Sequence, residues 1–203
     1  MLIKTIPVGH LETNCYIVTD ENTLGCAVID PGDESNTIMD YLEDNHLSCK
    51  AILLTHGHYD HTGAVAAVAE ETGAPVWMNR RDTRKPTEND PYRYAPPEGC
   101  NFYDDGDCVD VDALHFQVIA TPGHTPGGVS LVCGEALFTG DTLFRHECGR
   151  CDLEGGDFSA MLRSLKRLSE LEGDYKVLPG HEGISTLDEE RAANPYMLQA
   201  RGR

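Results

Sequence analysis

Basic side chains are scarce in this sequence. Its 203 residues contain 16 lysines and arginines against 34 aspartates and glutamates, which gives a formal net charge of −18. An overall field of that sign repels the phosphate backbone of nucleic acids. We therefore expect no nucleic-acid partner.

Long apolar runs are missing as well. No run approaches the ~20 residues that a membrane-spanning helix needs, and the stretch 1–8 is too short and too soon interrupted for a secretory signal peptide. We therefore expect no membrane partner and a cytoplasmic location. The Gly-x-Ser-x-Gly motif is absent too, so a serine-nucleophile mechanism of the α/β-hydrolase type has no support.

The remaining composition is that of an ordinary globular protein. Hydrophobic residues make up 40% of the chain and charged residues 25%, which are common values for globular domains. The length suffices for one sizeable core. We predict a single domain over residues 1–203, without an internal linker or an exact repeat.

Cysteine is present eight times, at positions 15, 26, 49, 100, 108, 133, 148 and 151. The length and the apolar content of the chain favour reduced thiols over a disulfide scaffold. Cys15, Cys26 and Cys133 lie in apolar segments, where we expect small core residues. Cys148 and Cys151 form a C-x-x-C pair, a spacing that suits a redox pair or a metal site. Because no second pair exists, we favour incidental loop residues.

The segment 55–61 concentrates metal-binding side chains. It has the sequence Thr-His-Gly-His-Tyr-Asp-His and follows the apolar run 51–54. Imidazole and carboxylate are the usual ligands of zinc and of its neighbours. One extended loop cannot wrap all four side chains around a single ion, but alternation directs His56 and His58 to one side. The other two, Asp60 and His61, are left to turn toward a second ion.

Three further turns present a histidine or an aspartate directly after an apolar segment. Glycine or proline in these turns allows the sharp bends that they need. The residues presented are His124 after 116–120, Asp141 after 136–138 and His181 after 175–178. A predicted strand therefore ends four times in a turn with candidate metal ligands.

These motifs resemble the metallo-β-lactamase superfamily, and within it the short glyoxalase II-like (hydroxyacylglutathione hydrolase-like) proteins. The resemblance covers nearly the whole chain and is carried by segments 14–16, 30–32, 55–62, 122–127, 140–144 and 180–181. It implies a four-layer αββα sandwich with the metal site at one edge of the two sheets.

The resemblance also implies the roles of the site residues. His56, His58 and His124 hold one metal ion, Asp60, His61 and His181 hold the other, and Asp141 bridges the two. Asp30 accepts a hydrogen bond from a ligand histidine, which fixes the orientation and the tautomer of that ring. For Asp30, a plain turn residue is the alternative.

Two such ions suit hydrolysis. Held ~3.5–4 Å apart, they lower the pKa of a shared water, and they polarise a carbonyl and stabilise its oxyanion. Asp141 can bridge because each of its oxygens binds one ion. Asp60 both binds the second ion and orients the hydroxide, which makes it the catalytic residue. We expect zinc, with iron or manganese as alternatives, because nitrogen and oxygen ligands accept all three.

The branch of the superfamily follows from the remaining residues of the expected site. β-Lactamases of this fold carry cysteine or serine where Asp141 stands, and flavodiiron proteins carry glutamate where His58 stands, so we disfavour both branches. Arg150 falls where the family has a basic substrate-binding residue, and Phe144 belongs to the motif at 140–144. We predict both as substrate contacts, with a structural ion pair as the alternative for Arg150.

The predicted substrate is a small-molecule thioester of the S-lactoylglutathione type. Glyoxalase II proper adds a C-terminal helical domain that helps to bind glutathione, and this chain is too short for a full one. The identity of the thiol carrier therefore stays open, as does the oligomeric state.

Two other functions stay open. A persulfide dioxygenase-like enzyme shares much of this ligand set but uses one iron, and the segment 148–152 resembles that branch too. A redox-sensing metal-binding module, in which Cys148 and Cys151 respond to oxidation, is the second alternative. Occupancy of the second site together with thioester turnover separates the hydrolase from both.

Apolar periodicity predicts the order of the elements. Strands are expected at 2–6, 15–19, 24–29, 51–54, 76–78, 109–111, 115–120, 129–133, 136–138 and 176–178, the first three as an antiparallel meander. Helices are expected from Ile38 to Leu47, over 64–71, over 158–171 and near the C-terminus. This order argues for two sheets packed face to face, with helices outside.

Five of the 16 basic residues fall between Arg80 and Arg93. A solvated helix face is the plain interpretation of this cluster. The functional interpretation is an anion-facing rim that recognises a carboxylated or phosphorylated thiol carrier. We expect the polar stretch 86–99 to be a surface loop at the site entrance.

Overall fold

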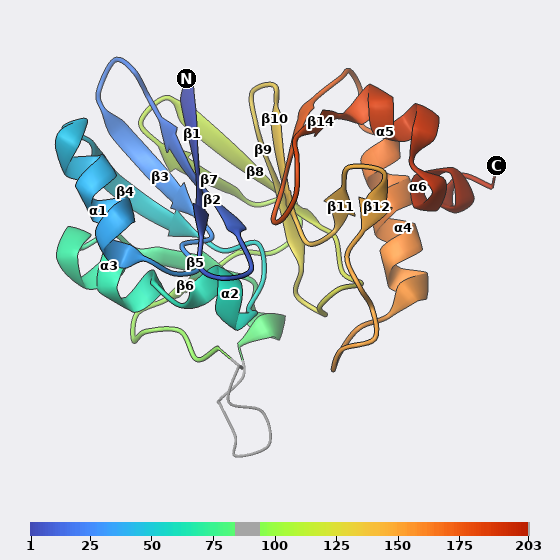
Figure 1. Ribbon diagram of the computed structural model, residues 1–203, viewed down its shortest axis with the longest axis horizontal. Helices are drawn as coiled ribbons and strands as arrows, with labels where there is room; N and C mark the ends of the chain where they lie inside the picture. The colour runs from blue at the N-terminus through green and yellow to red at the C-terminus, as the bar shows by residue number, and fades with distance from the viewer. Residues whose placement is uncertain (84–93, 203) are drawn as a thin grey trace.

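Two β-sheets lie face to face at the centre of the molecule (Figure 1). The computed structural model describes residues 1–83 and 94–202. Within them the first sheet has the strand order β1–β2–β3–β4–β5–β6 and the second β14–β13–β10–β9–β8–β7. The first sheet contains β1 (Leu2–Val8), β2 (Thr13–Thr19), β3 (Gly25–Ile29), β4 (Ser48–Leu53), β5 (Val76–Met78) and β6 (Asn101–Phe102). The second contains β7 (Cys108–Val111), β8 (Leu114–Ala120), β9 (Val129–Cys133), β10 (Ala136–Gly140), β13 (Lys176–Pro179) and β14 (Ser185–Thr186).

Helices cover the outer face of each sheet, at opposite sides of Figure 1. Helices α1 (Ser35–Asp44) and α3 (Val65–Thr72) pack on the first sheet. Helices α4 (Phe158–Ser169), α5 (Leu187–Ala193) and α6 (Pro195–Ala200) pack on the second. The order helix, sheet, sheet, helix confirms the predicted αββα sandwich.

The central strands of each sheet, such as β2, β3 and β10, are buried on both faces because each lies between the other sheet and a helical layer. In β2, Tyr16 and Val18 belong to the core between the sheets, whereas Cys15 and Ile17 belong to the core under α1 and α3. Alternation along the strand produces both faces. As predicted, Cys15, Cys26 and Cys133 are buried.

The first three strands form the predicted meander, since β1 pairs with β2 and β2 with β3 in antiparallel register. The strands that follow in this sheet are parallel: β3 pairs with β4, β4 with β5 and β5 with β6. In the second sheet β10 and β13 are parallel as well. Parallel neighbours place successive carboxyl-terminal loops at one edge of each sheet.

The helix predicted to reach Leu47 ends earlier, at Asp44. His46 has a positive φ of 56°, and the N–H of Leu47 donates to the carbonyl of Leu42 at 2.8 Å. This is the bonding pattern of a Schellman turn, which folds the chain back. Leu47 still packs against the core, so its apolar spacing reflects the cap rather than another helical turn.

Three short elements near the site were missing from the prediction. Helix α2 (Tyr59–Thr62) interrupts the first metal-binding segment, and β11 (Leu143–Phe144) pairs with β12 (Glu147–Cys148) as a separate hairpin. The buried Asn194 amide donates to the carbonyls of Phe144 and Glu147 at 3.3 and 2.9 Å. Elements of two to four residues carry too little periodicity to be recognised.

In the described part of the chain, no helix is long and apolar enough to cross a membrane. The single domain and the cytoplasmic location stay predictions.

Candidate metal centre

Four loops meet at one edge of the sandwich. The loop after β4 carries His56 and His58, and α2 within it carries Asp60 and His61. The loops after β8, β10 and β13 complete the set with His124, Asp141 and His181. Every predicted metal-binding residue is therefore brought to the same place, although the four loops come from both sheets.

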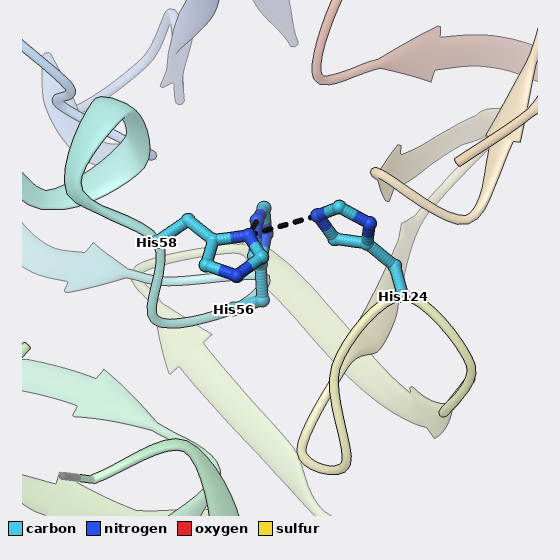
Figure 2. Close-up of side chains that lie close together, drawn as sticks. All are labelled: His56, His58 and His124. Atoms are coloured by element: carbon cyan, nitrogen blue, oxygen red, sulfur yellow. Dashed lines mark hydrogen bonds between the residues drawn. The ribbon is translucent and has the colours of Figure 1, made fainter. Parts of the chain in front are cut away.

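Three histidines form the first group, which we name the three-histidine cluster: His56, His58 and His124. Figure 2 shows His56 and His58 on one loop facing His124 on another. The Nδ1 atom of His58 lies 2.8 Å from Nε2 of His124 and 3.1 Å from Nε2 of His56. Three ring nitrogens within one ion's reach are a common arrangement for a divalent cation.

The second group is the mixed cluster: Asp60, His61 and His181. The Nε2 atom of His181 lies 3.2 Å from Oδ2 of Asp60 and 3.4 Å from Nε2 of His61. The Nε2 atom of His61 lies 3.5 Å from the same Asp60 oxygen. Two nitrogens and one oxygen thus converge on a second point that fits a cation.

Asp141 lies between the two clusters. Its Oδ2 is 3.3 Å from Nε2 of His124, and its Oδ1 is 3.3 Å from Nε2 of His61. Oδ1 is buried, and among the described residues no donor makes a hydrogen bond to it. A buried carboxylate oxygen without a donor is costly. A cation at this point would satisfy it, so the donor set fits metal ions on both sides of Asp141.

Contacts outside the clusters fix the histidine tautomers. A carbonyl or carboxylate oxygen only accepts, so the ring nitrogen that faces it carries a proton. The pairs are His124 Nδ1 with the carbonyl of Arg150 at 2.7 Å, His61 Nδ1 with Asp30 Oδ2 at 3.0 Å, and His181 Nδ1 with the carbonyl of Leu11 at 3.2 Å. Each of these rings therefore turns Nε2 toward the clusters, where a metal ion needs a lone pair.

Asp30 lies where the resemblance implies. Besides the ring of His61, it accepts hydrogen bonds from the amide and the hydroxyl of Thr55, at 2.7 and 2.6 Å. Thr55 begins the loop that bears the ligands, and its hydroxyl oxygen lies 3.2 Å from Nδ1 of His56. Asp30 thus orients one histidine directly and another through Thr55.

The electrostatics differ between the clusters. Burial, followed by the charge of His61, holds the pKa of His56 well below its ordinary value, and burial lowers the pKa of His58 to about 4. Neutral imidazoles therefore occupy these positions at neutral pH, which is the form that binds a metal ion.

In the mixed cluster the pKa values of the histidines are raised instead of lowered. Burial of His61 opposes its charged form, but the carboxylates of Asp141 and Asp30 outweigh burial and raise its pKa well above the ordinary value. Burial of His181 opposes its charged form as well, but the hydrogen bond to Asp60 together with the charges of Asp141 and Asp60 outweighs burial and raises its pKa. Burial likewise opposes ionisation of Asp60 and Asp141, yet the facing histidines lower both carboxyl pKa values.

A pocket of about 820 Å³ opens over the clusters. Five of the predicted metal ligands line it: His58, Asp60, His124, Asp141 and His181. Aromatic and apolar side chains also line it, namely Leu11, Tyr59, Tyr94, Phe144 and Leu153. The charged residues of the lining include Arg150, Glu147, Glu154 and Glu182. A volume of this size suits a small molecule.

Both predicted substrate contacts line this pocket. The ring of Phe144 stands edge-on to His181, with centroids 6.1 Å apart. The guanidinium of Arg150 is exposed and pairs with Asp152 through two hydrogen bonds of 2.7 and 2.8 Å. The geometry thus contains the ion pair that was the alternative for Arg150, at a position that also faces the pocket.

Cys148 and Cys151 are free thiols in the segment that supplies the carbonyl of Arg150. Burial raises the pKa of Cys148 to about 12 and also raises that of Cys151. Thiols with raised pKa values are poor nucleophiles, which agrees with incidental loop residues.

The basic stretch extends beyond the described residues, since Arg84, Lys85 and Arg93 fall between 84 and 93. Of the remaining two bases, Arg80 lies over the ring of Phe102 at 3.7 Å.

The sequence analysis assigned no role to Asn14 and Tyr16, which stabilise one loop of the site. The amide of Asn14 donates to the carbonyls of Pro179 and Glu182 at 3.0 and 3.1 Å, and the hydroxyl of Tyr16 donates to Pro179 at 2.7 Å. These two residues fix the turn that bears His181. Their segment, 14–16, was a matching motif, but only the structure shows what it contacts.

A further group of possible ligands, on β7 and β8, does not belong to the pocket lining. Cys108, Asp110 and His115 lie within metal-binding reach of one another but are exposed. Nδ1 of His115 and Oδ1 of Asp110 form a hydrogen bond of 2.6 Å, which accounts for their approach without a metal.

The fold and the paired clusters define a metallo-hydrolase. The comparison with known families agrees: a model of the metallo-beta-lactamase superfamily matches residues 8–181, and the chain belongs to that superfamily.

Individual relatives match over nearly their whole length. Hydroxyacylglutathione hydrolase GloC of Haemophilus influenzae is 32% identical over 209 residues, which cover 97% of this chain and 98% of that protein. The crystal structure of the BLEG-1 B3 metallo-beta-lactamase has a TM-score of 0.88 at 31% identity and covers 97% of this chain and 99% of its own. The crystal structure of TTHA1623 in a di-iron-bound form has a TM-score of 0.82 at 35% identity, with coverages of 95% and 99%.

Proposed function

We propose that this chain hydrolyses thioesters of the hydroxyacylglutathione type with two divalent metal ions. The observation that carries the proposal is Asp141, a carboxylate between two ligand clusters with one buried oxygen that lacks a hydrogen-bond donor in the described structure. Likeness along 97% of the chain to a protein named hydroxyacylglutathione hydrolase GloC supports the substrate class.

In this proposal the three-histidine cluster holds one ion and the mixed cluster holds the other. Asp141 offers Oδ1 to the mixed cluster and Oδ2 to the three-histidine cluster. Zinc is the proposed metal, because histidine nitrogen and carboxylate oxygen suit it. Iron is the principal alternative, since a similar structure is named for its di-iron-bound form, and manganese is a further one.

Such ions, when bound, lower the pKa of a shared water and polarise the carbonyl of the substrate. Asp60 then has a task of its own. Its lowered pKa keeps it ionised near neutral pH, and the hydroxyl of Thr13 lies 3.3 Å from its Oδ2 as a donor. An ionised carboxylate in this position would accept a hydrogen bond from the attacking hydroxide and so orient it toward the acyl group.

The pocket residues position the rest of the substrate. Phe144 packs beside His181, so its ring forms an apolar wall next to the mixed cluster. Arg150 stands on the rim, where its guanidinium can exchange Asp152 for a carboxylate of the thiol carrier. The acyl carbonyl then lies over the clusters and the thiol carrier extends along the pocket.

The test combines metal analysis with three assays on the purified protein. We expect two equivalents of metal and hydrolysis of S-lactoylglutathione. One equivalent of iron with persulfide-dependent oxygen uptake would instead support the dioxygenase alternative, and hydrolysis of a β-lactam alone would favour the activity for which BLEG-1 is named. Metal binding without turnover in any assay would favour the redox-sensing module.

The variant Asp141→Ala tests the bridging carboxylate. It should lose at least one metal equivalent and all thioester hydrolysis, because both clusters lose an oxygen. Hydrolysis that survives this substitution would contradict the two-ion mechanism.

A further inference from the structure

A buried carboxylate is hydrogen-bonded to both loops of the three-histidine cluster. It belongs to Asp82, the last residue of the 3-10 helix η1 (Arg80–Asp82), and this residue is only 6% exposed. Asp82 belongs to none of the sequence motifs, and the proposed arrangement of two metal ions around Asp141 assigns it no role. A buried charge needs several donors to offset the loss of water, so the groups that supply them are informative.

The donors come from both loops of the three-histidine cluster. Oδ2 of Asp82 accepts from the amide of Gly57 at 3.1 Å and from the hydroxyl of Thr125 at 2.7 Å. Oδ1 accepts from the amide of Gly127 at 2.6 Å. Gly57 stands between His56 and His58 in the chain, and Thr125 follows His124. One carboxylate is therefore hydrogen-bonded within one residue of all three histidines.

The two glycines leave space for this carboxylate. A Cβ atom at Gly127 would stand 2.5 Å from Oδ1 of Asp82, and one at Gly57 would stand 2.8 Å from the Asp82 carbonyl oxygen. Real Cβ atoms essentially never come that close, so any side chain at either position would push Asp82 away. The glycines of both loops fit around the same residue.

The helix that carries Asp82 is itself fixed in place. Asn79 caps η1 by accepting a hydrogen bond from the amide of Arg81 at 3.0 Å. The amide group of Asn79 also donates to the carbonyl of Tyr103 at 3.1 Å and to Oδ1 of Asp104 at 3.2 Å. These contacts anchor Asp82 to the strand region next to β6, independently of the two loops that it holds.

We propose that Asp82 is a positioning residue for the three-histidine cluster: it fastens the loop of His56 and His58 to the loop of His124 and so sets the spacing of their ring nitrogens. The two loops come from different sheets. Asp82 acts on the loops through two backbone amides and the Thr125 hydroxyl, whereas Asp30 also contacts the ring of a ligand histidine, His61. The inference rests on metal binding by this cluster, a part of the proposed function, and not on the substrate.

The near-isosteric variant Asp82→Asn isolates this role. Asparagine keeps the volume and one acceptor oxygen, but whichever way its amide turns, the NH₂ group faces a backbone N–H, that of Gly127 or that of Gly57. A backbone N–H cannot rotate away, so one of these two contacts is lost. Residues that support metal ligands typically change metal affinity by roughly 10- to 100-fold when substituted.

The experiment measures zinc affinity by competition with a chromophoric chelator on metal-free protein. Two backgrounds separate the clusters: His181→Ala removes a ligand of the mixed cluster, and His58→Ala removes a ligand of the three-histidine cluster. In the His181→Ala background, Asp82→Asn should weaken the remaining site roughly 10- to 100-fold. In the His58→Ala background the same change should leave the remaining affinity within about twofold, because the three hydrogen bonds described above join Asp82 to residues next to the three-histidine cluster.

Two further variants complete the design. Asp105→Asn makes the same chemical change at an exposed carboxylate that pairs with Arg167, and zinc affinity should not change. Thr125→Val removes a single donor from Asp82 with little change of volume, and it should weaken the same site by a smaller factor. This variant keeps the test decisive if Asp82→Asn does not fold.

The inference is overturned if Asp82→Asn weakens both sites equally, or if neither Asp82→Asn nor Thr125→Val changes the affinity of the three-histidine cluster. A protein that binds no metal in the His181→Ala background would overturn the proposed function together with this inference. Thioester turnover is not a readout here, so a wrong substrate leaves the result valid.

Discussion

Arg150 combines two contacts that serve different purposes. Its backbone carbonyl accepts from Nδ1 of His124, and its guanidinium pairs with Asp152 on the rim of the pocket. A substitution of the side chain leaves the carbonyl in place. The residue therefore allows substrate binding to be tested without disturbing the metal ligands.

Arg150→Ala should raise KM about tenfold with little change in kcat, since a charged hydrogen bond to the thiol carrier exists before and during the reaction. Steady-state kinetics on S-lactoylglutathione measure both constants, and metal content should stay constant. Asp152→Ala is the control, because it frees the guanidinium and should not raise KM. An unchanged KM in Arg150→Ala would leave the ion pair with Asp152 as the role of Arg150.

The two clusters should differ in the protons that they release on binding metal. The pKa values of His61 and His181 are raised, so these rings carry an extra proton that a metal ion must displace. The pKa of His58 is lowered to about 4 and that of His56 is also lowered, so these rings are already neutral at pH 7.

Calorimetry at pH 7 in buffers of different ionisation enthalpy measures this difference. Zinc binding should release protons in the His58→Ala background, which keeps the mixed cluster, and fewer in the His181→Ala background. The number of protons released when zinc binds the mixed cluster should fall as the pH rises through the raised pKa values of His61 and His181. Equal release from both backgrounds at pH 7 would contradict the assignment.

At the scale of elements, the turn after β13 has almost no free volume. A Cβ atom at Gly180 would stand 2.3 Å from Oδ1 of Asp141 and 2.7 Å from Cε1 of His61. Only glycine fits between the bridging carboxylate and the mixed cluster. Three residues further on, Gly183 has nothing within 4 Å of its Cβ position.

Gly180→Ala should therefore reduce metal binding at the mixed cluster by at least tenfold, whereas Gly183→Ala should bind metal like the unsubstituted protein. Both variants replace a glycine by alanine in the same turn. The effect of this replacement on the backbone entropy of the unfolded chain is therefore nearly the same in both. Metal content after dialysis against a weak chelator gives the comparison. Normal binding by Gly180→Ala would mean that the turn can move aside.

Sequence patterns predicted the elements unevenly, for physical reasons. The apolar strands and α4 were evident because alternation and three-four spacing persist over many residues. The ligands of the loop at 55–61 were evident because their spacing is local. Asp82 was not, since its donors are two backbone amides and one hydroxyl that lie 25 to 45 residues away in the chain. Side-chain patterns do not reveal contacts of this kind.

At the scale of the whole molecule, the metal centre joins the two sheets. His56 and His61 belong to a loop of the first sheet, and His124, Asp141 and His181 belong to loops of the second. Without metal, the seven ligand residues leave a buried oxygen without a donor and crowd ring nitrogens against one another. Bound cations should therefore stabilise the folded state.

Removal of metal by a chelator should lower the melting temperature. A ligand at 100 times its Kd stabilises the folded state by about 2.7 kcal/mol, which corresponds to roughly 5–10 °C for a chain of this length. Differential scanning calorimetry with and without chelator measures the shift, and zinc should restore it. Asp105→Asn should show the same shift, whereas Asp141→Ala should show a smaller one. A melting temperature that does not respond to chelation would contradict a metal centre between the sheets.

Tyr16 and Asn14 on β2 hold the turn that follows β13, which is among the later strands of the chain. The amino-terminal sheet is synthesised first. The mixed cluster lacks one of its ligands, His181, until the second half of the chain has left the ribosome and packed against the first sheet. Metal binding by the complete mixed cluster would therefore come after translation of most of the polypeptide. A nascent chain stalled before that point would present the loop with Asp60 and His61 to the cell's metal ions without His181, the third member of their cluster.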